Sequence, residues 1–135
     1  MNPKRLARIV AVKERIAKIR RGELAEATVL LRSAEATEQT AEHVHAETSD
    51  HLTSKGDATG AELARRATIV AMAATGLVQA RALLHEQEVE HAVRTDAVIV
   101  ARQEVRMLEV LQARAARKAA HEEKKRDQAQ TDEAA

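Results

Sequence analysis

The sequence predicts an all-α protein, a long antiparallel two-helix coiled-coil hairpin with helices at about residues 3–54 and 60–128. Two stretches each repeat apolar residues at every seventh position. A seven-residue repeat held this long keeps one stripe of the helix facing a partner helix. Phe, Tyr, Trp and Cys are absent, so the core must be a thin layer of aliphatic side chains. This composition, with heptad spacing, is typical of a long helix or a coiled coil.

The second helix carries the longer repeat. From Ala61 to Gln128 there is no Pro and one Gly, Gly76. At about 1.5 Å per residue such a helix is roughly 100 Å long, too long for a globular core to enclose. Its predicted seam consists of Leu63, Val70, Leu77, Leu84, His91, Val98 and Val105.

The first helix should begin at Asn2-Pro3, because Asn suits the N-cap and Pro suits the first helical position. It should end near Ser54, where Lys55 and Gly56 supply a cation and a left-handed cap. Its predicted seam is Ile9, Ile16, Glu23, Leu30, Thr37, Val44 and His51, flanked by Val12, Ile19, Ala27, Ala34 and Ala41.

Residues 55–60 form the clear turn cluster between the helices. Thr59 and Glu62 fit a capping box at the start of the second helix. Two helices joined by so short a connection are most simply an antiparallel hairpin. If the chain folds at residue 57, facing residues have numbers that add to about 114. The two seams then match apolar against apolar, and the polar residues Glu23 and His91 face each other.

The second helix is predicted to be longer than the first. The hairpin accounts for residues 3 to about 112, and the following segment stays compatible with helix but loses strongly apolar residues after Leu111. An isolated helix is marginal in water, so this overhang should fray unless it docks. We therefore expect one hairpin domain at residues 1–128 and a disordered tail at 129–135.

Charge is segregated along the chain, although the formal net charge is only +1. Residues 1–21 carry eight basic groups against one acid, and residues 102–126 carry eight against four. Residues 35–62 carry seven acids against one lysine. Antiparallel folding brings both basic segments to the end that holds the termini, and this pattern says more about partners than the total charge does.

The sequence has no motif for catalysis. It lacks a Gly-rich phosphate loop, a nucleophile elbow and Cys ligands, so we expect no enzyme activity and no cofactor. Glu88 and His91 have the spacing of half a carboxylate-bridged di-metal site, but a second set of ligands is missing. We interpret Glu23 and His91 instead as a structural polar layer that fixes the register.

The basic end favours an acidic protein partner. Nucleic acid is a weaker interpretation, because aromatics for base stacking are absent and acids interleave with the C-terminal basic residues. A solvated charged face without a role stays an alternative. We expect no membrane span, because a continuous apolar run of the required length is not evident. A cytoplasmic protein is the expectation.

The chain resembles the FliJ family, the stalk proteins of flagellar and related type III export machines. The C-terminal run from Leu108 to Arg114, followed by Glu122 to Gln128 and Asp132 to Ala134, is similar to the family's ending. The stretch from Arg66 to Gln87 is similar to its segment entering the second helix. This chain departs from the pattern in lacking aromatics, with Ala134 where the family usually has Phe.

The resemblance implies a central stalk without catalytic activity. The terminal end would enter the pore of a hexameric export ATPase, and the chain would couple this ATPase to the membrane export gate protein and escort export chaperones. It would be cytoplasmic and peripheral at the inner membrane. The implied gate-binding residues are Ile69, Met72, Ala73 and Gly76. The implied ATPase-binding residues are Arg5, Arg8, Leu108, Leu111, Arg114, Arg117, Lys118, Glu122, Arg126, Asp127 and Gln128.

Two other classes of function fit parts of the pattern. One is another soluble coiled-coil adaptor or peripheral-stalk subunit of a rotary ATPase, which would form tight oligomers through the flanks of the hairpin. The other is a nucleic-acid or membrane-surface binder that uses the basic end, with strongly salt-dependent binding.

Overall fold

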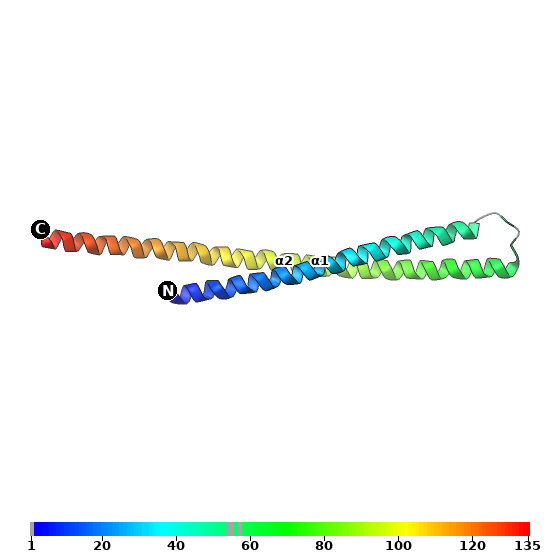
Figure 1. Cartoon of the computed structure of the whole chain (residues 1–135), viewed down its shortest axis with the longest axis horizontal. Helices are drawn as coiled ribbons and strands as arrows, with labels where there is room; N and C mark the ends of the chain where they lie inside the picture. The colour runs from blue at the N-terminus through cyan, green and yellow to red at the C-terminus, as the bar shows by residue number, and fades with distance from the viewer. Residues whose placement is uncertain (1, 54–55, 57) are drawn as a thin grey trace. The chain divides into compact units, whose positions relative to one another are not determined.

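The computed structural model describes residues 2–53, 56 and 58–135, and it confirms the all-α hairpin. Helix α1 spans Pro3–Thr53 and helix α2 spans Gly60–Ala134 (Figure 1). Ser54, Lys55 and Asp57 lie outside the described residues, and so does the cap predicted around Lys55. Residues 129–134, predicted as a disordered tail, lie within α2.

Both helices begin with the predicted caps. The Asn2 Oδ1 accepts a hydrogen bond of 3.0 Å from the backbone N–H of Lys4. The Thr59 Oγ1 accepts one of 3.2 Å from the backbone N–H of Glu62. Each cap satisfies a backbone donor that the first turn of a helix leaves without an intrahelical partner. The starting residues were therefore readable from the sequence.

Contacts between the helices divide the chain into two compact units, where one hairpin domain had been predicted. Unit 1 contains the chain up to Glu23 together with Thr95–Ala135, and unit 2 contains Leu24–Arg94. The buried side chains of unit 1 include Leu6, Val10 and Ala17 from α1 with Val98 and Ala101 from α2. Those of unit 2 include Ala27, Ala34, Leu77 and Ala80. In each unit the core is a single layer of aliphatic side chains, as the absence of aromatics predicted.

The predicted seam of α2 is confirmed over most of its length. Leu77 and Val98 are buried, and the members between and beside them, Val70, Leu84, His91 and Val105, are half-buried. Leu63 is the exception, because it is exposed near the start of the helix.

The predicted seam of α1 is wrong in unit 2. Leu30 is 54% exposed, and Thr37, Val44 and His51 are exposed as well. The alanines expected beside the seam occupy it instead: Ala27 and Ala34 are buried, and Leu24, Leu31 and Ala41 are half-buried. Two adjacent seven-residue series run along this helix, and small side chains at the contact let the helix axes approach closely. In unit 1, Ile9 and Ile16 of the predicted series are half-buried, while the flanking Val12 and Ile19 are exposed.

The register also differs from the prediction, by about one helical turn. In unit 2, Thr28 contacts His91 and Glu38 contacts Arg81, two pairs whose numbers add to 119. In unit 1, Lys13 contacts Glu104, and their numbers add to 117. The predicted value of 114 paired the wrong series of α1 with the correct series of α2.

Candidate functional site

A charged groove lies between the helices of unit 1. It has a volume of about 820 Å³, and small or apolar side chains of Ala11, Ala17 and Val105 contribute to its lining. Glu14 and Glu109 also line it, together with five basic side chains, those of Arg15, Lys18, Arg21, Arg102 and Arg106. Basic side chains outnumber acids, so the groove suits an acidic ligand and gives the basic end of the chain a defined surface.

The sequence did not predict this groove. The basic character of both segments was evident, but which residues meet depends on the register, and the predicted register was displaced. Lys13 and Glu104 of unit 1 are not among the residues that line this groove, and the Lys13 Nζ donates to the Glu104 Oε2 at 3.0 Å. That ion pair is partly exposed, so it contributes little to stability.

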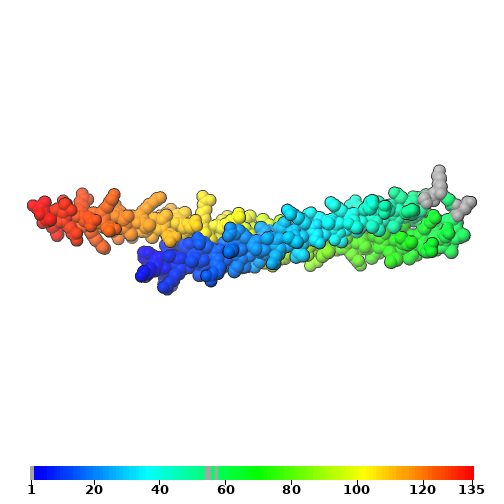
Figure 2. Space-filling view, in the orientation of Figure 1, coloured from blue at the N-terminus to red at the C-terminus, as the bar shows by residue number. Residues whose placement is uncertain are grey.

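The end of α2 in unit 1 is uncovered. Every residue from 116 to 135 is exposed, and Figure 2 shows this part of α2, drawn in orange and red, continuing past the start of α1. The predicted overhang is therefore confirmed, although it begins at residue 116 and not at 112, and its helix continues to Ala134. Mixed charges and alanines cover it, with no strongly apolar residue after Leu111.

All of the residues assigned to ATPase binding by resemblance belong to unit 1. Leu108 is half-buried, whereas the others are exposed: Arg5, Arg8, Leu111, Arg114, Arg117, Lys118, Glu122, Arg126, Asp127 and Gln128. They do not converge on one pocket but follow the surface of α1's first turns and the uncovered end of α2. This arrangement fits an extended contact surface and offers no enclosed ligand site.

An uncharged groove lies between the helices of unit 2. It has a volume of about 380 Å³. Its lining combines small residues with a few larger ones: Thr37, Ala41, Val44, Ala73, Gly76, Gln79, Ala80 and Leu83. The absence of charge from its lining distinguishes it from the groove in unit 1 and indicates an apolar ligand surface such as a helix face.

The predicted gate-binding residues lie in or beside this groove. Ala73 and Gly76 line it, and Ile69 lines a neighbouring hollow of about 180 Å³ with Arg66. Met72 is 69% exposed on the outer surface of α2. The residues of α2 that the resemblance implied therefore lie in one region of the structure. The α1 residues that line the same groove, Thr37, Ala41 and Val44, were not predicted.

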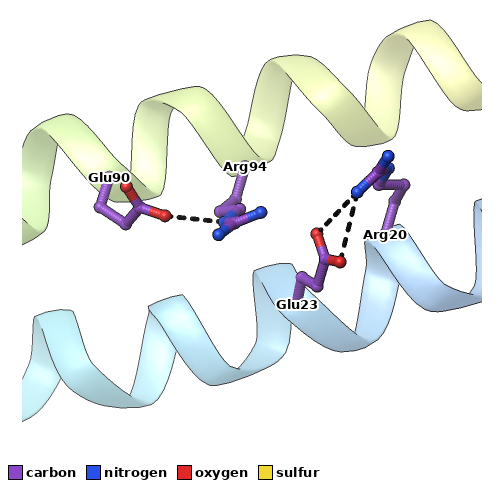
Figure 3. A network of polar contacts seen from close by, with 4 residues as sticks. All are labelled: Arg20, Glu23, Glu90 and Arg94. Atoms are coloured by element: carbon purple, nitrogen blue, oxygen red, sulfur yellow. Dashed lines mark hydrogen bonds and ion pairs between the residues drawn. The ribbon is translucent and has the colours of Figure 1, made fainter.

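The predicted structural polar layer involves residues of both units. In unit 1 the Arg20 guanidinium and the Glu23 carboxylate form an ion pair of 3.2 Å along α1 (Figure 3). In unit 2 the His91 Nε2 lies 3.2 Å from the Thr28 Oγ1. Contact between Glu23 and His91 stays a prediction. Thr28 was not predicted, since a lone threonine gives no signal without the correct register.

A second ion pair lies within α2, in unit 2. The Arg94 Nε donates to the Glu90 Oε1 at 2.8 Å (Figure 3). Pairs spaced by three or four residues stabilise a helix by about 0.2–0.5 kcal/mol each. Each pair therefore contributes a little to the stability of its own helix.

Within the residues that the structure describes, no group of three or more His, Cys, Asp or Glu side chains is placed to hold a metal ion. Glu88 and His91 belong to no such group among those residues. What the geometry offers is two surfaces, a charged groove with an uncovered helix end in unit 1 and an uncharged groove in unit 2. Comparison with protein-family models, with curated proteins and with solved structures finds no match to this chain.

Proposed function

We propose that this chain is a stalk component of a flagellar or type III protein export apparatus. It binds a hexameric export ATPase through unit 1 and couples it to the membrane export gate protein through unit 2, and it also escorts export chaperones. The single observation that carries the proposal is the uncovered end of α2, which exposes every residue from 116 onward. An isolated helix of this kind gains from docking, because packing supplies most helix stability in proteins.

Charge supports the same assignment. The groove of unit 1 carries five basic side chains, and further arginines and lysines follow on the uncovered part of α2. A basic surface is steered toward an acidic one and associates faster than a neutral surface. A ring lumen lined with acids is the partner that this arrangement fits.

The mechanism is mechanical. Unit 1 contacts subunits of the ring in turn, favours their assembly and raises their turnover. The uncharged groove of unit 2, with Ile69, Met72, Ala73 and Gly76 nearby, provides the contact to the gate protein.

The proposal predicts a rise in ATP hydrolysis when the purified full chain is added to the export ATPase of the same organism. Ring assembly should rise in parallel, measured by sedimentation. A chain that neither raises turnover nor co-sediments with the ATPase would contradict the proposal and would favour the adaptor class. Serum albumin at equal mass controls for non-specific stabilisation of the ATPase.

A further inference from the structure

Residues 67–84 of α2 form a mostly apolar segment. They contain one charged residue, Arg81, and three uncharged polar ones, Thr68, Thr75 and Gln79. Helix α1 covers one side, where Leu77 and Ala80 are buried, but Ile69, Met72 and Val78 are exposed. A helix with apolar residues on most of its circumference is normally buried. The face turned away from α1 is exposed, so we expect another surface to pack against it.

The one charge in this segment is directed toward α1. The Arg81 Nε lies 3.4 Å from the Glu38 Oε1, and the Glu38 side chain is only 17% exposed. The Arg81 side chain is itself 57% exposed, so Arg81 lies at the edge of the contact with α1, where its guanidinium is paired. The outward face therefore presents apolar and uncharged polar side chains only, among them Met72, Thr75 and Val78.

Charges of opposite sign bracket the segment. Arg65 and Arg66 precede it, and Glu86 and Glu88 follow it. Arg65 and Glu86 are separated by three whole heptads, so they lie on the same side of α2, and both are exposed. The midpoint between them falls at Thr75 and Gly76. If two copies of this segment lie antiparallel, the arginine of each copy meets the glutamate of the other, whereas parallel copies place like charges together.

We propose that the free chain forms a homodimer in which two copies pack the outward faces of residues 67–84 against each other, antiparallel, about a two-fold axis near Thr75 and Gly76. Such an interface is isologous, so each favourable contact occurs twice. The dimer covers Met72 and therefore excludes other partners from this face while it persists. This inference does not depend on the export ATPase.

A lipid bilayer is the competing cover. Helix α2 holds an 18-residue window with a mean hydropathy of 1.5, which by length and composition is apolar enough to cross a membrane. The expectation that no apolar stretch of this length exists is therefore wrong, whereas the absence of a membrane span stays a prediction. Crossing would strip Leu77 and Ala80 of their packing on α1. It would also break the pair between Arg81 and Glu38 and place the guanidinium in hydrocarbon, which is costly. The bracketing charges favour the second copy.

The first test is the mass of the full chain in solution, measured by analytical ultracentrifugation over a range of micromolar concentrations. The wild-type chain should sediment as a dimer that dissociates on dilution. Met72→Asp should leave a monomer with unchanged helix content. Met107→Asp is the matched control, because Met107 is a methionine of α2 in unit 1 with a similar exposure of 64%. A wild-type monomer, or equal loss with both variants, would overturn the proposal.

The second test is charge exchange. Arg65→Glu and Glu86→Arg should each weaken self-association by about tenfold, because each places like charges together at both symmetric contacts. The double variant restores opposite charges in an antiparallel dimer and should regain the wild-type affinity. Failure of this rescue, with both variants still helical, would overturn the antiparallel arrangement.

The chain has no Cys, so Thr75→Cys introduces a unique thiol beside the proposed axis. Oxidation should link two copies in high yield, and a low yield equal to that of Thr131→Cys in unit 1 would count against the axis. Vesicles of neutral and anionic phospholipid distinguish the competing cover. Flotation of the monomeric chain with either vesicle would contradict the dimer and would show that a membrane surface covers this face.

Discussion

Replacing Leu77 by alanine is expected to lower the free energy of unfolding by about 2–4 kcal/mol. Leu77 is 7% exposed and lies in the core of unit 2, which otherwise consists largely of alanines. Truncation removes a large share of the apolar area in a thin layer and leaves a space that the neighbouring alanines cannot fill. Urea denaturation followed by circular dichroism, at one fixed chain concentration, measures the loss.

Val29→Ala is the matched control. Val29 also belongs to unit 2, but it is 67% exposed on α1 and lies outside residues 67–84. Alanine has a higher helix propensity than valine by about 0.5 kcal/mol, so this variant should retain or slightly gain stability. If the two variants lost equal stability, the heptad seam would not run through Leu77.

Reversing the charge on the uncovered part of α2 is expected to abolish stimulation of the export ATPase. Arg114→Glu, Arg117→Glu and Lys118→Glu together turn three positive charges into three negative ones. All three side chains are exposed, so the fold of unit 1 should persist. Since steering and docking both depend on opposite charges, the reversed surface is repelled by an acidic ring. ATP turnover at increasing chain concentration measures the effect.

The control for this reversal preserves charge at the same positions. Arg114→Lys and Arg117→Lys keep the sign while losing the planar guanidinium. Stimulation should survive in this variant and should fall as salt rises, because exposed charges are screened. Stimulation that survives charge reversal would show that unit 1 does not act through its basic end.

The seven-residue spacing of the buried residues was predictable from the sequence, but which series of α1 faces α2 was not. On α2, Val70, Leu77 and Leu84 lie one heptad apart with no equally apolar series beside them, so the seam followed directly. On α1, Leu30 and Leu31 are adjacent and belong to two competing series. In the structure the series that faces α2 contains Leu31 with Ala27 and Ala34, because small side chains permit close packing. That choice depends on the partner helix, which a pattern read along one helix does not include.

Of the candidate surfaces, one was predictable from the sequence and the two grooves were not. The uncovered end of α2 was predictable, because strongly apolar residues stop at Leu111. Both grooves depend on which residues of α1 lie opposite α2, so a displacement of one turn hid them. Once the contact between Thr28 and His91 fixes the register of unit 2, the meeting of Ala41 with the Ala73 region follows. The role of Ile69 and Gly76 stays a prediction.

The central claim is that the uncovered end of α2 enters the export ATPase, and site-specific cross-linking tests it most directly. The absence of Cys allows Ala119→Cys in unit 1 and Ala36→Cys in unit 2, two exposed alanines, to carry the same photoreactive group. We expect the group at position 119 to cross-link to ATPase subunits and the group at position 36 to give no product. Cross-linking from position 36 without product from position 119 would contradict the account.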